Sequence, residues 1–313
     1  MSTIGFIARL PITSIPASAL FYNPLMHKSE ASANFCIMPA RPLHHTKITA
    51  LYNRWIPEAS AGMRITEDHV AMRLERDPHS VLVGFFAPDF ENPVSLINVV
   101  KLAMDTSTHA FSRHIPKSHQ ELTGNDTFST TDPKGNVWFC PWVVMHDRAF
   151  GYALKWRDVF RNAARLHVLT VANLAIQSGF ATRVFAYSRP IDLKRTVEKM
   201  LGTKLTHNVI DGVQQIFANG KRLGKDTKGI YRRHDNGKKE YIVKLSSLLR
   251  EEGGLKDTGF RLHKCNGGQF LPDMVFPDGH VYDTQSLGFG TCFEYDLGDL
   301  KSFIEETPLP FRT

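Results

Sequence analysis

The residues best placed to do chemistry lie where an apolar segment gives way to a helical one. Residues 137–145 (VWFCPWVVM) have the composition of a buried β-strand, and a helical pattern runs from about Gly151 to Ser178. A strand that turns into a helix presents backbone N–H groups at the positive end of the helix dipole, and such a turn binds phosphate or pyrophosphate. Gly151 lets the backbone approach the ligand, and Ala153 keeps the first helical turn narrow. The sequence therefore predicts a phosphate-binding loop after residue 145.

The elements that must position this loop follow from the surrounding pattern. Thr66 is a suitable N-cap for a helix ending at Asp77-Pro78, and Pro141 should interrupt the 137–145 strand because proline cannot donate to a β-ladder. Residues 105–135 are polar and predict a long surface loop. The apolar pattern also predicts a helix at 48–55 and strands at 35–38, 80–86, 94–104, 183–187, 260–263 and 290–295.

The segment Arg148-x-x-Gly151-x-Ala153 resembles the (Gln/Arg)-x-x-Gly-x-(Gly/Ala) loop with which GCN5-related N-acetyltransferases (GNAT) hold the coenzyme A pyrophosphate. Val143 stands five residues ahead of the arginine, as in many members. The order of elements over roughly residues 35 to 300 also resembles this superfamily, in the form of an atypical bacterial-type member with a long insertion.

The resemblance implies an α/β fold with a GNAT-like mixed, mostly antiparallel central sheet flanked by helices. It implies an acyltransferase domain at 35–313, after a loosely ordered or targeting N-terminal arm at 1–34. A basic insertion at about 191–258 has no counterpart in a minimal member, and we expect it to be mixed, mainly helical and interrupted by several Gly turns. Acetyl-CoA or a longer acyl-CoA would be the co-substrate, held by Val143, Val144, Arg148, Ala149, Phe150, Gly151, Tyr152 and Ala153.

The reaction implied by the resemblance is attack of an amine on the acyl-CoA thioester, with an unidentified small molecule or protein as acceptor. A backbone N–H near the interruption at Pro141 would polarise the thioester carbonyl. Tyr187 is the candidate acid for the leaving thiolate, and His146 is the candidate base for the amine proton. The structural alternatives are that Tyr187 caps the sheet and that His146 helps to form the turn.

Three further sets of residues have two interpretations each. Cys140 is either a nucleophile or a packing residue in its strand. His263 is either a core histidine or a substrate contact. Trp138 and Trp142 should share one strand face because their spacing is even, and they would line either the core or an acyl tunnel.

The charge distribution supports two competing functions. The chain has a formal net charge of +7, and residues 194–250 hold 14 Lys/Arg against 5 Asp/Glu. Such a basic segment is typical either of a solvated face or of a surface for phosphate-rich ligands or nucleic acid. A nucleic-acid-binding protein is not favoured, because Phe217, Tyr231 and Tyr241 are the segment's few aromatic residues. A non-catalytic acyl-CoA-binding protein is the other alternative, because the 137–145 strand carries no Glu.

Metal binding and membrane spanning are not expected. The four cysteines form no CxxC pair, and His109, His114 and His119 recur every five residues, a spacing that places them on no common helix or strand face. No apolar run reaches the ~18 residues that a membrane helix needs. We therefore expect a cytoplasmic protein without a metal, with secretion or targeting through residues 1–34 as the alternative.

Overall fold

The strands of the computed structural model form three five-stranded sheets. The structure describes residues 21–22, 34–54, 56, 61, 64–87, 89–103, 119–145, 157–249, 257–265 and 267–299. The first sheet has the order β1-β2-β3-β4-β7, with all neighbours antiparallel. Its strands are β1 (Phe21–Tyr22), β2 (Asn34–Pro39), β3 (Val81–Ala87), β4 (Ser95–Asn98) and β7 (Val143–Met145).

The second sheet has the order β14-β15-β8-β6-β5, and in it β6 and β8 form a parallel pair between antiparallel neighbours. Its strands are β5 (Val100–Leu102), β6 (Val137–Cys140), β8 (Arg183–Ser188), β14 (Gln269–Phe276) and β15 (Gly290–Tyr295). Taken together, the two sheets are mostly antiparallel with one parallel pair, which confirms the predicted mixed α/β fold class.

The first two sheets meet where two strands are interrupted side by side. The predicted 137–145 strand divides into β6 and β7 at Pro141-Trp142, and the predicted 94–104 strand divides into β4 and β5 at Val99. The Asn98 N–H donates to the Trp142 carbonyl at 3.0 Å across the junction. Because Pro141 has no N–H for a ladder, the chain leaves one sheet there and enters the next. The predicted interruption is confirmed, and it separates the two sheets.

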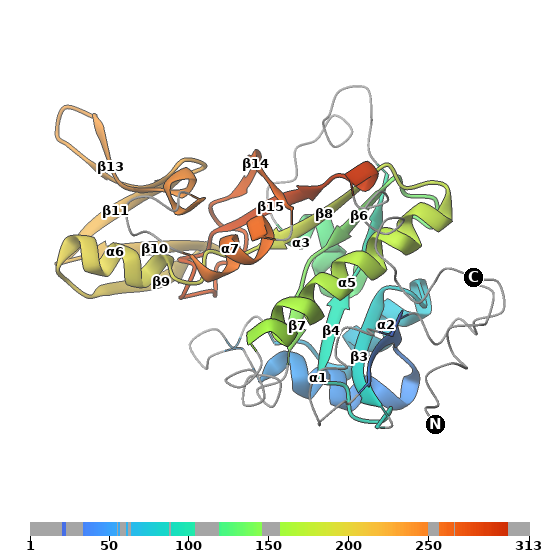
Figure 1. The fold of residues 1–313 in the computed structure, drawn as a ribbon. Helices are drawn as coiled ribbons and strands as arrows, with labels where there is room; N and C mark the ends of the chain where they lie inside the picture. The colour runs from blue at the N-terminus through green and yellow to red at the C-terminus, as the bar shows by residue number, and fades with distance from the viewer. Residues whose placement is uncertain are drawn as a thin grey trace.

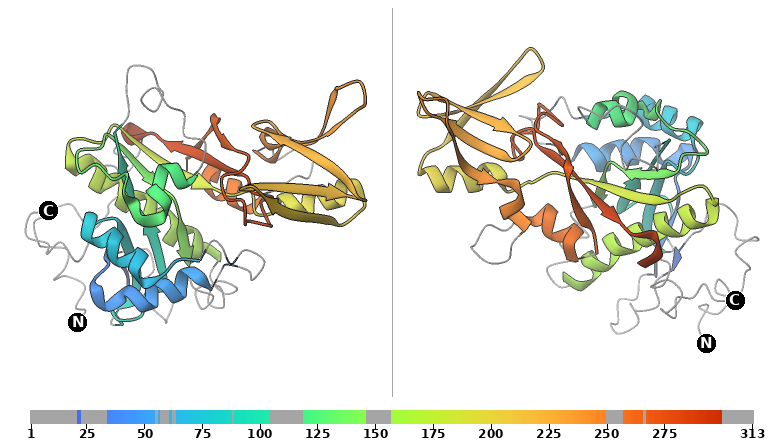
Figure 2. Two further views of the ribbon diagram at one scale, coloured as in Figure 1. Left: turned by 180° about the vertical axis from the view of Figure 1, so that it is seen from behind. Right: turned by 90° about the horizontal axis from the view of Figure 1, so that it is seen from above.

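Helices cover both faces of the first sheet (Figure 2). On one face, α1 (His45–Asn53) and α2 (Glu67–Arg76) bury Ile48, Leu51 and Val70 against β3 and β4. On the other face, α5 (Arg157–Ser178) buries Val168, Val171 and Ala175, as its helical spacing predicts. Helix α2 begins where the sequence predicts, since the Thr66 hydroxyl accepts the N–H of His69 at 3.2 Å.

The third sheet projects from one end of the molecule beyond β14 and β15 (Figure 1). After α6 (Leu193–Leu201) it runs in the order β13-β12-β11-β10-β9. Its strands are β9 (Leu205–Ile210), β10 (Val213–Ala218), β11 (Lys221–Asp226), β12 (Gly229–Arg233) and β13 (Lys239–Lys244). The prediction that this region is mainly helical is therefore wrong. Asp211-Gly212 and Asn219-Gly220 all have positive φ and join neighbouring strands, as in two-residue hairpin turns.

In the described part of the chain, five further short helices lie between these strands. They are η5 (Pro42–His44), α3 (His119–Thr123), the π-helical turn η7 (Gly124–Phe128), η8 (Leu245–Leu249) and α7 (Thr258–Cys265). The predicted strand at 260–263 is wrong, because these residues lie in α7. The Asp257 side chain accepts the N–H of Phe260 at 3.0 Å, as an N-cap does, and so starts a helix there. Among the described residues, no helix is long and apolar enough to cross a membrane.

Candidate functional site

Most of the predicted coenzyme A loop lies outside the described residues. Val143 and Val144 form the start of β7, where they are half-buried and pair with Ile97 and Leu96 of β4. His146 and the residues Arg148, Ala149, Phe150, Gly151, Tyr152 and Ala153 lie outside the described part of the chain. Their role in binding coenzyme A stays a prediction.

Tyr187 lies in β8, fully inside the second sheet. It pairs with Cys292 of β15 and is 6% exposed, and its hydroxyl has no hydrogen-bond partner. A methyl group on Gly290 would lie 1.8 Å from that hydroxyl, and one on Gly279 would lie 2.7 Å from it. Two glycines therefore create the space in which the phenol sits.

Three more side chains with unpartnered polar atoms lie near Tyr187, and they are connected to its ring through His119. His119, the first residue of α3, lies 4.5 Å from the Tyr187 ring and 4.4 Å from the Trp142 ring between centroids. His280 lies 6.4 Å from the His119 ring. Both nitrogens of each histidine and the indole nitrogen of Trp142 are buried without a partner. We call His119, Trp142, Tyr187 and His280 the buried polar cluster.

The electrostatics keep the cluster uncharged. Burial lowers the pKa of His119 well below its usual value, and the nearby His280 lowers it further. Burial also lowers the pKa of His280. Burial raises the pKa of the Tyr187 phenol well above its usual value. Near neutral pH each imidazole is therefore in the form that can accept a proton, and the phenol is in the form that can donate one.

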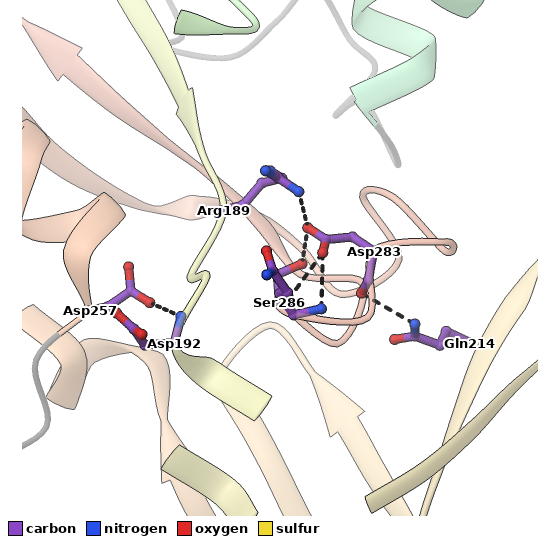
Figure 3. A network of polar contacts seen from close by, with 7 residues as sticks. Arg189, Asp192, Gln214, Asp257, Asp283 and Ser286 are labelled. Carbon is purple, nitrogen blue, oxygen red and sulfur yellow. Dashed lines mark hydrogen bonds and ion pairs between the residues drawn. The ribbon is translucent and has the colours of Figure 1, made fainter. Parts of the chain in front are cut away.

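A partly buried ion pair, in which Asp283 is the buried member, holds the β14–β15 loop (residues 277–289), which carries His280. Arg189, two residues after Tyr187, donates to the Asp283 carboxylate at 2.7 Å, and the Ser286 hydroxyl donates to the same oxygen at 2.7 Å (Figure 3). Burial alone would raise the pKa of Asp283, but Arg189 and Ser286 hold it below the usual value. The Asp283 carbonyl also accepts from the Gln214 amide of β10 at 3.3 Å. The loop is thus fixed to both β8 and the third sheet.

A buried cation, Arg73 of α2, also lies next to Trp142. Its guanidinium lies 5.4 Å from the Trp142 ring, and the side chain is fully buried. It donates to the Asp126 backbone carbonyl at 2.7 Å and to the Asn98 amide oxygen at 3.4 Å, while its second terminal nitrogen has no partner. Within the described part of the chain no carboxylate forms an ion pair with it.

The structure resolves three of the open interpretations. Burial raises the pKa of the Cys140 thiol to about 12, so it packs as a neutral side chain rather than acting as a nucleophile. His263 is a core histidine that bonds the Tyr295 hydroxyl at 2.9 Å and stacks on Phe293. The expectation that Trp138 and Trp142 share a face is wrong, because they belong to different core clusters. The strand is interrupted at Pro141, so side chains before and after it no longer alternate between the same two faces.

Sequence reasoning identified Tyr187 but missed its partners. In the sequence His119 is marked only as one of three evenly spaced histidines, and the other two, His109 and His114, lie outside the described residues. His280 and Arg73 carried no local signal, since they are brought to Trp142 and Tyr187 from segments far apart in the sequence. Among the described residues, no three His, Cys, Asp or Glu side chains are grouped to hold a metal ion.

Among known proteins, similarity to this chain is found in solved structures and not in sequences. No protein-family model and no curated protein sequence matches the chain. The chain is similar to the GphF GNAT-like decarboxylase in complex with isobutyryl-CoA, with 16% identity, coverage of 83% of this chain and 98% of that one, and a TM-score of 0.47. It is similar to the loading GNATL domain of CurA from Lyngbya majuscula, with 10% identity, coverage of 85% and 98%, and a TM-score of 0.48.

A malonyl-CoA decarboxylase from Rhodopseudomonas palustris is also similar, with 13% identity, coverage of 87% of this chain and 63% of that one, and a TM-score of 0.43. At these identities the likeness concerns the fold alone. We therefore derive the function from this chain's own residues.

Proposed function

We propose that the chain is an acyl-CoA-dependent acyltransferase whose reaction takes place at the buried polar cluster. The observation that carries this proposal is that His119, Tyr187 and His280 are buried and neutral, and that none of their ring nitrogens or hydroxyl finds a partner. A buried polar group without a partner costs about 1–3 kcal/mol. A substrate that binds to these groups would offset this cost, and perturbed titratable groups gathered in one place favour a functional site.

The position of the cluster supports an acyl-CoA as the ligand. Trp142 precedes β7 directly, and the predicted pyrophosphate loop follows β7 directly. Three strand residues span roughly 10 Å. The thioester of a coenzyme A bound by the 146–153 loop would therefore need only to reach back along β7 to meet His119 and Tyr187.

In the proposed reaction, the amine nitrogen attacks the thioester carbonyl carbon and the carbon–sulfur bond breaks. The neutral imidazole of His119 accepts the amine proton, and the Tyr187 phenol donates a proton to the leaving thiolate. The imidazolium then returns its proton to the phenolate, so the protons balance. His146 stays an alternative base, and the acceptor is an amine on a small molecule or a protein.

Arg73 favours a second candidate reaction, the decarboxylation of a carboxyacyl-CoA. A fully buried guanidinium without a carboxylate partner is costly, and a substrate carboxylate beside Trp142 would pair with it. Loss of CO₂ would leave an enolate, which the Tyr187 phenol could protonate, and the phenolate would then regain a proton from water. No amine acceptor is needed for this reaction.

One experiment separates the two reactions. The purified chain is incubated with acetyl-CoA or malonyl-CoA, each with and without a mixture of polyamines and amino acids, and free thiol and CO₂ are recorded. Acyl transfer releases thiol only when an acceptor amine is present. Decarboxylation releases CO₂ from malonyl-CoA and yields acetyl-CoA without free thiol, and R73Q should abolish it.

The remaining outcomes decide against catalysis. Tight acyl-CoA binding with neither product would favour a non-catalytic acyl-CoA-binding protein. Failure of every acyl-CoA to bind or to raise the melting temperature would refute the proposal.

A further inference from the structure

A cavity of about 460 Å³ lies on the third sheet, away from the buried polar cluster. It is lined by residues of β10, β11 and β12 and by Asp278 of the β14–β15 loop. This volume is in the range of small-molecule sites, which is roughly 300–1,000 Å³. Residues 205–244, which form the sheet, hold nine Lys/Arg against four Asp/Glu, so the surroundings of the cavity are basic.

Two arginines, Arg222 of β11 and Arg233 of β12, line the cavity. Gly224 of β11 pairs with Tyr231 of β12 in an antiparallel register. This is the last pair of the β11–β12 ladder, and beyond it Arg222 pairs with β10 while Arg233 pairs with β13. Both arginines nevertheless line the same cavity. Neither guanidinium forms an ion pair in the described part of the chain. Two guanidinium groups that line one cavity repel each other, and an anion bound there would remove that repulsion.

The charge of the lining fits a dianion. Lys225 adds a third cation, but its ammonium is paired with the Asp278 carboxylate at 2.5 Å. Three cations and one carboxylate leave a net charge of +2 on the lining. A phosphate monoester carries about −1.5 to −2 at neutral pH, and arginine binds its oxygens in a bidentate manner.

The aromatic side chain of the cavity is unsuited to stacking with nucleobases. The Tyr231 ring lies across Gly224, where an added methyl group would come within 2.3 Å of it, and the residue is 7% exposed. The buried Gln214 adds an amide oxygen without a partner at the cavity wall, which can accept from a ligand hydroxyl. A compact, hydroxylated phosphate ester fits these groups better than a single-stranded nucleic acid does.

We propose that this cavity is a second ligand site, which binds the phosphate monoester group of a small molecule between Arg222 and Arg233. The site is joined to the loop that carries His280. Gln214 donates to the Asp283 carbonyl at 3.3 Å, and Lys225 donates to the Leu287 carbonyl at 3.3 Å. Binding can be measured without turnover, so the proposal does not depend on the acyltransferase reaction.

The test is calorimetric titration of the full chain with inorganic phosphate and with glycerol 3-phosphate. The double variant R222Q/R233Q should weaken binding by at least about tenfold. The matched control K221Q/K228Q removes the same charge from the same sheet, at exposed residues that do not line the cavity, and should change the Kd by less than about twofold. Equal thermal midpoints would show that all the variants are folded.

A second pair of titrations identifies the source of the phosphate. If R222Q/R233Q weakens binding of coenzyme A but not of 3′-dephospho-coenzyme A, the site holds the 3′-phosphate of that molecule. If neither changes while glycerol 3-phosphate binding is lost, the ligand is a separate metabolite. The proposal is overturned if the wild-type chain binds no phosphate ester. The same variants are also titrated with single-stranded RNA. The proposal is overturned if R222Q/R233Q and K221Q/K228Q lose phosphate binding equally or lose RNA binding equally, because an equal loss indicates a diffuse basic surface.

Discussion

Replacing Tyr187 by phenylalanine should separate the role of its hydroxyl from that of its ring. The ring packs against His119 and Phe276, and Y187F keeps these contacts. The hydroxyl is buried without a partner. Removing such a group relieves a cost of about 1–3 kcal/mol, so we expect the free energy of unfolding to rise by about 1 kcal/mol.

The same substitution should lower activity. If the phenol protonates the leaving thiolate, its loss should slow turnover by about 10²-fold, the low end for a general acid, because a thiolate is a good leaving group. Urea denaturation followed by circular dichroism gives the stability, and thiol release from acyl-CoA gives the turnover. A variant that is more stable and less active indicates a hydroxyl kept for function rather than for folding.

Tyr295 provides a matched control on the neighbouring strand. Its hydroxyl bonds the His263 ring at 2.9 Å, and it is 2% exposed. Y295F should therefore lower the free energy of unfolding by about 1 kcal/mol and leave turnover unchanged. If Y187F lost stability as Y295F does, the hydroxyl would have a structural partner. If Y187F kept full turnover, Tyr187 would not be the acid.

Three further predictions concern the surroundings of the cluster. G290A should greatly reduce turnover in the thiol assay, because its methyl group would lie 1.8 Å from the Tyr187 hydroxyl and displace the ring, while near-wild-type turnover would show that the ring can move freely. D283N should cost about 3 kcal/mol in urea denaturation, since it leaves Arg189 without its carboxylate, and a cost below about 1 kcal/mol would mean that the pair is not important for stability. Burial lowers the pKa of His263 to about 4, so the unfolded chain binds a proton that the native chain excludes, and stability should fall by about 3 kcal/mol between about pH 6.5 and pH 4. H263Q should flatten this pH dependence, and an unchanged slope would contradict the assignment.

Local patterns determined the elements and their boundaries wherever one signal dominated. Thr66 and Asp77-Pro78 bound a helix because a capping hydroxyl and a proline act within a few residues. Pro141 predicted the break between β6 and β7 for the same reason. In the third sheet the expectation of a helical insertion is wrong, although Asp211-Gly212 and Asn219-Gly220 are residue pairs typical of two-residue hairpin turns.

The sequence by itself predicted a mixed α/β fold and placed Tyr187 at the end of a buried strand near the candidate site. Only the tertiary structure assembled the buried polar cluster. His119, Trp142, Tyr187 and His280 come from four segments, and none has a neighbour in the chain that marks it as functional. Their lowered or raised pKa values arise from burial by residues distant in sequence. Burial of this kind follows from how the sheets meet, which no local pattern specifies.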